Sequence, residues 1–454
     1  MMGIDGDKQH QFMFLNLDDL VPENHFLRVV RNKIDFSFIY EKVQHLYSPV
    51  GRRSVDPVLL MKMILIGYLY GIPSERKLEQ EIQVNLAYRW FLGLDLADTV
   101  PDHSTLSQNR RRRFKESHIF QEIFDHIVSE CIRAGLVTGE IIVVDSTHIK
   151  ANASINRSEK VLVEKKPTEY LEELEKEARR IKKDRDNDPT RKKRGRKPKT
   201  SPPEKEVKQS TTDPESGLLN RPNKPKGFHY LAHTSVDVKH GIITDIHVTA
   251  ANVNDHEPFI KRLQIQKEKF GLHIGKVGAD KGYDRSGVHH ELENLKITGY
   301  ISPIKGVIDQ TERSVQFTFD EMNDAYYCSN GKALQFTHVK WHSWKQSYSK
   351  IYAAQTKDCK SCELRQQCFG QTASRKTIER PLFQEAKERN QARKQSQEYS
   401  VIQRQRRIWC EGTFGTMKRQ HNLKETYKRG IRNVSEHCLF SAMAINIKRM
   451  IKAN

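Results

Sequence analysis

The apolar run Ile141–Val144 constrains the fold of this chain more than any other segment. Its four consecutive residues are β-branched, and an uninterrupted apolar run of this kind is typical of a strand buried on both faces. We expect the strand to begin at Glu140 and to end at Asp145. The acid would then lie at the end of a buried strand, which is where α/β sheets usually carry their chemistry.

The segments that follow alternate between strand and helix patterns. Residues 230–252 contain two predicted strands joined at Lys239–Gly241, with a glycine at the turn. A helix over about 255–270, a strand at 276–280, a helix over about 286–295 and a strand at 298–303 come next. This order predicts a mixed α/β sheet.

The first 138 residues have helical patterns throughout. Asp56, Ser74 and Ser104 are predicted helix caps, and Pro57 fits a first helical position. Four arginines, Arg110–Arg113, follow the last of these caps. The region is interpreted either as a helical bundle with a solvated basic surface or as a DNA reader similar to a helix-turn-helix, with the arginines on phosphates.

Two segments interrupt the predicted core. Residues 156–226 have few apolar residues and a short charged helix candidate, so we expect a disordered or weakly ordered basic insertion. Within it, Arg194 and Arg196 belong to RGRKP, which is similar to a minor-groove AT-hook; a basic linker with non-specific phosphate attraction is the alternative. Residues 302–395 form the second interruption between core parts 139–301 and 396–454.

The composition favours a polyanionic partner. The chain of 454 residues has a formal net charge of +20, and two or more domains are the default at this length. Nucleic acid is the commonest partner for such a charge, and an anionic membrane is the competing interpretation. There is no run of about eighteen apolar residues and no signal-peptide pattern, so we expect a cytoplasmic protein without a membrane segment.

Four of the seven cysteines cluster in the second interruption. Cys328 is followed by a C-x2-C pair and one further cysteine, which predicts a structural Zn²⁺ site with four thiolates. Reduced, unliganded cysteines in a loop are the alternative. The predicted ligands are Cys328, Cys359, Cys362 and Cys368.

Three acids in different surroundings are candidate ligands for Mg²⁺, which prefers oxygen donors. Asp145 and Asp280 each follow a predicted strand, and Asp284 is a rival to Asp280. Glu411 lies in a helix pattern. Carboxylates that hold magnesium are what phosphodiester chemistry needs.

The surroundings of Glu411 indicate phosphoryl transfer. Arg404, Arg407 and Lys418 are spaced to share one helical face with it, which combines a metal ligand with cations for phosphate. Gly412 would cost such a helix about 1 kcal/mol relative to alanine. We therefore expect a backbone or DNA to approach closely there.

Together these motifs resemble the Asp-Asp-Glu (DDE) transposases of bacterial insertion sequences. The resemblance is carried by VDSTHIKANAS, by HVTAANVNDHE with GADKGYD, and by R-x3-E-x6-K in RQRRIWCEGTFGTMK followed by YKRGIRN; PDHSTLSQNR in the helical region is also typical. Arg404 stands where relatives often carry tyrosine, so the role of that tyrosine does not transfer.

The resemblance implies a ribonuclease-H-like core in which Asp145, Asp280 and Glu411 bind two Mg²⁺ or Mn²⁺ ions. It implies strand cleavage and strand transfer, with Arg407 and Lys418 near the cut. The implied partners are the terminal inverted repeats, target double-stranded DNA and further copies of the chain, as a homodimer or higher oligomer on the bacterial nucleoid. The alternatives are a magnesium-dependent nuclease without strand transfer and an inactive, transposase-derived DNA-binding regulator.

Overall fold

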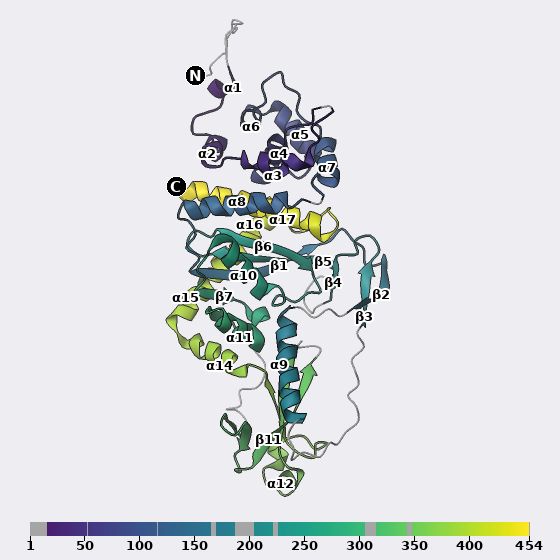
Figure 1. Ribbon diagram of the computed structural model, residues 1–454, viewed down its shortest axis with the longest axis vertical. Coiled ribbons are helices and arrows are strands. Elements are labelled where there is room, and N and C mark those ends of the chain that lie inside the picture. The colour runs from purple at the N-terminus through teal and green to yellow at the C-terminus, as the bar shows by residue number, and fades with distance from the viewer. Residues whose placement is uncertain are drawn as a thin grey trace, which may run out of the picture.

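The computed structural model describes residues 16–51, 53–115, 117–164, 169–186, 204–220, 226–304, 315–342 and 347–453. The molecule is elongated, with an N-terminal group of helices at one end, a large sheet in the middle and a second sheet at the other end (Figure 1). The large sheet and the N-terminal helices share one continuous apolar core, and the second sheet has a small core of its own.

The central sheet has six strands in the order β4-β5-β1-β7-β8, with β6 paired to β5. β1, β5 and β6 are antiparallel neighbours, whereas β7 and β8 run parallel to β1. This arrangement confirms the predicted mixed sheet. The strands are β1 (Ile141–Lys150), β4 (Gly217–Leu219), β5 (Gly227–Asp237), β6 (Ile243–Ala250), β7 (Lys276–Ala279) and β8 (Thr298–Ile301).

β1 is longer than the sequence predicts. The strand continues past Asp145 to Lys150, because β5 pairs with it along its whole length. The parallel partner β7 pairs only with residues 141–143. Asp145 therefore lies inside the strand, just beyond the point where its pairing with β7 stops.

Helices cover the central sheet and join it to the N-terminal part (Figure 1). The longest, α17, is almost fully buried along its middle and packs against α8, α4 and β6. α10 and α11 follow the hairpin and β7 along the chain, as predicted. The bounds are α8 (Ile119–Arg133), α10 (Phe259–Phe270), α11 (Ser286–Asn294) and α17 (Ile431–Ala453).

The N-terminal region is helical, as expected. Asp56 caps α4 and Ser74 caps α5, both through side-chain oxygens that accept backbone N–H groups. The cap of α7 is Asp102 instead of Ser104, because Asp102 accepts the Ser104 N–H at 2.6 Å. The elements are α1 (Leu17–Leu20), α2 (Phe26–Lys33), α3 (Phe38–Val43), η1 (Gln44–Leu46), α4 (Pro57–Leu69), α5 (Glu75–Val84), α6 (Leu86–Leu92) and α7 (His103–Arg112).

The first insertion contains a strand pair that the sequence did not indicate and a helix at the position of the predicted charged helix candidate. β2 (Ser158–Glu164) and β3 (Glu204–Ser210) form an antiparallel pair, and α9 (Glu169–Asp186) lies against strands of the second sheet. Leu174 and Ala178 of α9 are buried by this packing, which explains how a charged segment is ordered. The expectation of disorder is thus wrong for these parts. Arg194 and Arg196 lie outside the described residues.

The second insertion is an antiparallel sheet in the order β13-β12-β11-β10-β9. Tyr326, Leu334 and Tyr352 form its core. Its elements are β9 (Phe317–Asp320), β10 (Ala325–Cys328), β11 (Ala333–His342), β12 (Ser347–Ala353), α12 (Thr356–Lys360), α13 (Arg365–Cys368), β13 (Thr377–Pro381), α14 (Gln384–Ala392) and η4 (Arg393–Gln395). Among the described residues, no helix is both long and apolar enough to span a membrane.

Candidate active site

Asp145 and Asp280 lie at the same level on neighbouring parallel strands. β1 and β7 pair Val143 with Gly278, so the residue two positions further along each strand is one of these two acids. Neighbouring strands are about 4.8 Å apart, and residues in parallel register direct their side chains to the same face. The sequence predicted both acids but not this shared level, which only the strand pairing determines.

Asp255 is a third acid at the same place, and sequence reasoning did not select it. It accepts a 2.5 Å hydrogen bond from the Ser146 hydroxyl. One carboxylate oxygen each of Asp255 and Asp280 lies 2.9 and 3.0 Å, respectively, from the position that a Cβ on Gly282 would occupy. Asp255 lies in HVTAANVNDHE at the start of the predicted helix over about 255–270, where no predicted strand end marks it as a candidate ligand.

The buried phenol of Tyr283 lies among the three aspartates. Burial raises the pKa of Tyr283 well above its ordinary value, and the charges of Asp255, Asp145 and Asp280 raise it further. Tyr283 belongs to the short helix η2 (Lys281–Tyr283), which Asp280 caps by accepting the Gly282 N–H at 2.8 Å. The three carboxylates therefore surround a neutral hydroxyl group.

Asp145 titrates unusually high for an aspartate. Burial raises its pKa to about 6, and the neighbouring charges of Asp280 and Asp255 act in the same direction. Arg406 opposes them, because its Nη1 donates to Asp145 Oδ2 at 2.6 Å. A site that crowds carboxylates in this way favours binding of a cation.

Glu411 ends a π-helical turn, η5 (Arg407–Glu411), between α15 (Gln397–Arg406) and α16 (Gly412–Gln420). A π turn holds one extra residue, which rotates the following side chains by about 100° relative to a continuous α-helix. The helix that carries Arg404, Arg407 and Glu411 is therefore not the continuous α-helix that the predicted shared face assumed. Arg406, which the sequence did not single out, faces Asp145 instead.

The buried thiol of Cys410 connects Glu411 to the aspartates. Burial raises the pKa of Cys410 well above its ordinary value, and both Asp145 and Glu411 are close enough to raise it further. η5 packs against β1 and β5. Glu411 itself has an exposed side chain next to this contact.

α15 is attached to the ends of the parallel strands. Gln403 donates from Nε2 to the carbonyl oxygens of Ala279 at 3.0 Å and Tyr300 at 2.6 Å. A Cβ on Gly278 would lie 2.5 Å from Ile402 Cγ2, so only glycine allows the helix to approach β7 this closely. These contacts position the helix that carries Arg406 and leads to Glu411.

Asp284, the predicted rival of Asp280, is used elsewhere. It is buried and pairs with His289 Nε2 at 3.0 Å and with Lys387 Nζ at 2.8 Å. Burial pushes its pKa upward, but the His289 hydrogen bond and Lys387 hold the pKa below its ordinary value. Asp280 is therefore the better candidate ligand.

The residues predicted to contact DNA differ in how far they are exposed. Arg110 is paired inside the molecule with Glu75 and Glu436, and Arg113 stacks over the Tyr47 ring. The exposed arginines are Arg111, Arg112, Arg404 and Arg407, whereas Lys418 is half-buried in the wall of a cavity. An added Cβ on Gly412 would meet no protein atom within 4 Å, so the expected close approach of a protein backbone is not found.

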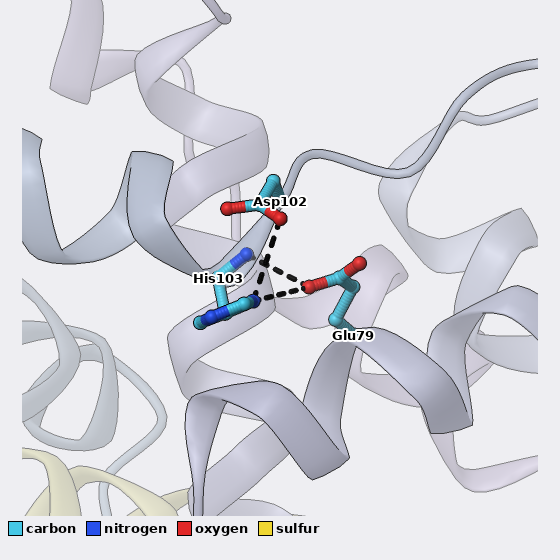
Figure 2. A group of neighbouring side chains, drawn as sticks. All are labelled: Glu79, Asp102 and His103. Carbon is cyan, nitrogen blue, oxygen red and sulfur yellow. Dashed lines mark hydrogen bonds and ion pairs between the residues drawn. The ribbon is translucent and has the colours of Figure 1, made fainter.

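Among the described residues, one group of three metal-binding side chains has ligand atoms within 4.8 Å of one another, and it consists of Glu79, Asp102 and His103. Asp145, Asp280 and Glu411 are not this close. Figure 2 shows that the group joins α5 to the start of α7: Glu79 Oε2 accepts the His103 backbone N–H at 2.9 Å and lies 2.8 Å from its Nδ1. Asp102 is the cap of α7, so the group is a helix junction.

The four predicted zinc ligands line one small cavity of about 30 Å³ in the second insertion. Cys328 ends β10, Cys359 lies in α12, and Cys368 ends α13. Burial raises the pKa of Cys368, and the other three thiols raise it further. Within the described part of the chain, no three of the sulfur atoms lie within 4.8 Å of one another.

Comparison with known proteins gives two family matches. A Transposase domain (DUF772) matches residues 15–112, and a Transposase DDE domain matches residues 327–451, which include Glu411 and the four clustered cysteines. Asp145 and Asp280 lie between the two matched segments. No curated protein matches the chain.

Two solved structures are similar at low scores. A piggyBac transposase synaptic complex with hairpin DNA has 10% identity and a TM-score of 0.38, over 95% of this chain and 76% of that chain. The Mos1 mariner paired end complex with Mn has 9% identity and a TM-score of 0.17, over 60% of this chain and 70% of that chain. Such scores do not establish a shared fold, so the family assignment depends on the two domain matches.

Proposed function

Because the chain belongs to the DDE transposases, we propose that Asp145, Asp280 and Glu411 are its catalytic carboxylates. As a DNA transposase, it would cut and join strands at the inverted-repeat ends of an insertion sequence. The observation that carries this proposal is the register of β1 and β7, which sets Asp145 and Asp280 side by side. The helix that leads to Glu411 packs against the same two strands.

The strand order supports a ribonuclease-H-like core. Three antiparallel strands, β6, β5 and β1, are followed across the sheet by the parallel strands β7 and β8. Both crossovers into the parallel strands contain a helix, α10 and α11. Among the five strands β1, β5, β6, β7 and β8, Asp145 lies on the first in chain order and Asp280 directly follows the fourth. Glu411 lies in the helical segment after the last of them.

The donor set fits Mg²⁺ or Mn²⁺, because it consists of crowded carboxylate oxygens and no thiols or imidazoles. When bound, such ions would activate water or a 3′-hydroxyl and stabilise the leaving oxygen. Asp145, Asp280 and Glu411 would hold the ions. Ser146 and Asp255 would orient this edge of the site through their 2.5 Å hydrogen bond. Arg407 and Lys418 would bind the phosphates of the DNA.

The cysteine cavity fits structural Zn²⁺. Its four thiols come from the end of β10, from α12, from α13 and from the loop between these two helices, and three of them are in the C-x2-C-x5-C segment. A tetrahedral site requires Zn–S distances of about 2.3 Å, so the ion would draw the sulfur atoms together. The site would then cross-link β10 to α12 and α13.

The proposed partners are double-stranded DNA at the element ends, target DNA and a second copy of the chain. The net charge of +20 supports binding to the phosphate backbone. Joining two ends in one reaction supports a homodimer or higher oligomer.

The test uses purified full-length protein, DNA that carries an element end, and Mg²⁺. Cleavage followed by joined products is expected for the wild type and for none of Asp145→Asn, Asp280→Asn and Glu411→Gln. Cleavage without joined products would favour a nuclease, and binding without cleavage a regulator. If the three variants cleaved normally while remaining folded, the assignment of the carboxylates would be wrong.

Asp255 can be tested separately from the three carboxylates. If it acts by orienting Ser146, then Asp255→Asn and Ser146→Ala should reduce Mn²⁺ affinity equally, by about 10- to 100-fold. Titration of Mn²⁺ by electron paramagnetic resonance measures this affinity without turnover. A much larger loss for Asp255→Asn would instead identify Asp255 as a direct ligand, and unchanged affinity would exclude both roles.

A further inference from the structure

Tyr427 is a large aromatic residue that the fold leaves 83% exposed. It lies in the segment 421–430 between α16 and α17, on the wall shared by two neighbouring cavities of about 540 and 520 Å³. Glu425 and Thr426 belong to the same wall. We call residues 425–427 the Tyr427 ridge.

The ridge is held firmly although its tyrosine is exposed. The Thr426 N–H donates to the Lys150 carbonyl at 2.9 Å, and the Lys150 N–H donates to the Lys424 carbonyl at 3.1 Å. Asn152 Nδ2 donates to the Tyr427 carbonyl at 3.1 Å. These bonds attach the backbone of the segment to the end of β1, so binding of a partner would not have to order the backbone that carries the Tyr427 ring.

Cations surround the ridge on both sides. The first cavity is lined by Lys418, Lys424 and Lys428, and the second by Lys150, Arg157 and Arg429. Some of this charge is compensated, because Lys428 pairs with the buried Glu436 and Lys150 with Glu425. Lys424, Arg157 and Arg429 have exposed side chains that remain available to an anionic partner.

The ridge is also connected to the candidate active site by two elements. β1 carries both Asp145 and Lys150, which are about 17 Å apart along a strand. α16 begins next to Glu411 and carries Lys418 at the first cavity. A DNA strand in the active site would therefore reach the ridge within a few nucleotides.

We propose that the Tyr427 ridge binds unpaired nucleotides of a DNA strand, with one base stacked on the Tyr427 ring and the flanking phosphates on the cations of the two cavities. An exposed aromatic ring between cations is the combination that binds single-stranded nucleic acid, because every base has a face that can stack. Paired bases are stacked on one another and do not offer that face. The proposal depends on the proposed function, because it assumes that DNA is the substrate.

Binding is measured by fluorescence anisotropy on the full-length protein in EDTA, so that cleavage does not contribute. The probes are a blunt duplex and the same duplex with a single-stranded extension of about 12 nucleotides. Tyr427→Ala should weaken binding of the extended probe by about tenfold and leave the blunt duplex unchanged. Tyr427→Phe keeps the ring and should bind as the wild type does. Tyr327→Ala, at an exposed tyrosine of the second insertion, is the matched control.

A second readout reports the stacking itself. A 2-aminopurine base in the extension should be quenched on binding to the wild type and to Tyr427→Phe, and not on binding to Tyr427→Ala. Equal affinities of Tyr427→Ala and the wild type for the extended probe, or equal losses on both probes, would overturn the proposal. So would a loss in Tyr427→Phe, which would indicate a role of the hydroxyl group.

The outcomes for the ridge and for the proposed function are separable. If cleavage depends on Asp145 but Tyr427→Ala binds normally, only the ridge proposal fails. If the wild type binds neither probe, both fail.

Discussion

At the scale of single residues, Asp280 and Asp284 lie four positions apart and have different charged neighbours. Asp280 lies among other carboxylates, whereas Asp284, within the same GADKGYD motif, is neutralised by Lys387 and His289. Burial and the neighbouring carboxylates disfavour the ionised form of Asp145, and the Arg406 cation at 2.6 Å offsets only part of this cost, because the pKa of Asp145 is still raised. Metal binding needs ionised carboxylates, so the candidate active site lowers the stability of the metal-free folded protein in that ionised form. The effect can be measured at Asp145.

Asp145→Asn should stabilise the protein while it abolishes cleavage. The pKa of Asp145 is raised from 3.8 to about 6 in the folded state, so its ionisation costs at most about 3 kcal/mol, and this cost develops as the pH rises between those values. The gain in unfolding free energy from the substitution should be near zero at pH 3.8 and reach its full size above pH 6. Urea unfolding of the metal-free protein at several pH values measures it.

Asp284→Asn is the matched control for this experiment. Its pKa is lowered in the folded state, so the native carboxylate contributes stability above its ordinary pKa that is lost as the pH falls. The substitution should destabilise the protein at pH 7. Stabilisation by Asp284→Asn, or a pH-independent effect of Asp145→Asn, would contradict this account.

At the scale of elements, the π turn Arg407–Glu411 determines which side chains meet the aspartates. Strands were predictable because apolar runs and turn residues mark them, and the hairpin 230–252 was found for that reason. A π turn leaves no such pattern, since it changes the helical register by one residue without a change in composition. Arg406 was missed for another reason, because its partner Asp145 is 261 residues away in the sequence. That Asp145 and Asp280 lie side by side was also not predicted, because the register between β1 and β7 cannot be read from the sequence of either strand.

The glycine directly after the π turn tests whether DNA approaches this helix. Gly412→Ala adds a Cβ into open space in a helix, so it should increase the unfolding free energy by about 1 kcal/mol. If DNA lies against this surface, cleavage should nevertheless fall, because the methyl group occupies the contact. Thermal unfolding and cleavage assays on the same preparation measure both effects. Full cleavage by Gly412→Ala would exclude a close DNA contact there.

The small helices and strand end of the second insertion should depend on zinc. We expect one zinc ion per chain by elemental analysis, and its loss in Cys362→Ser. A chelator should lower the unfolding temperature of the wild type and have less effect on this variant. Cys131→Ser, at a buried cysteine outside the cluster, should retain the metal. If removal of zinc left the unfolding temperature of the wild-type protein unchanged, the proposed zinc site would be wrong.

At the scale of the whole molecule, the N-terminal helices are fastened to the core by a buried ionic contact. Glu436 Oε1 of α17 forms an ion pair with Arg110 Nε of α7 at 2.7 Å and accepts a hydrogen bond from Lys428 Nζ at 3.1 Å. Burial opposes its ionisation, but the two cations hold the pKa of Glu436 below its ordinary value. The sequence suggested phosphate contacts for Arg110, because a run of arginines does not reveal which of them a distant glutamate will hold.

Glu436→Gln should therefore destabilise the protein strongly. It removes the buried carboxylate that pairs with Lys428 and leaves Arg110 with Glu75 alone, at a cost of up to about 3 to 5 kcal/mol in unfolding free energy. Glu425→Gln is the control, because its pair with Lys150 is exposed and should contribute less than about 1 kcal/mol. Urea unfolding at pH 7 measures both. Equal losses of unfolding free energy for the two substitutions would show that burial does not determine how much each ion pair contributes to stability.

The position of α17 has a consequence for synthesis on the ribosome. Asp145 and Asp280 emerge from the ribosome well before Glu411, and α17 follows later still, although it fills the space between α8, α4 and β6. Until α17 has been synthesised, the apolar surfaces of α8, α4 and β6 that it covers stay uncovered. The set of candidate metal ligands is likewise incomplete until Glu411 has been synthesised. The three proposed ligands are therefore brought together only late in synthesis, after the strands that carry the first two have formed.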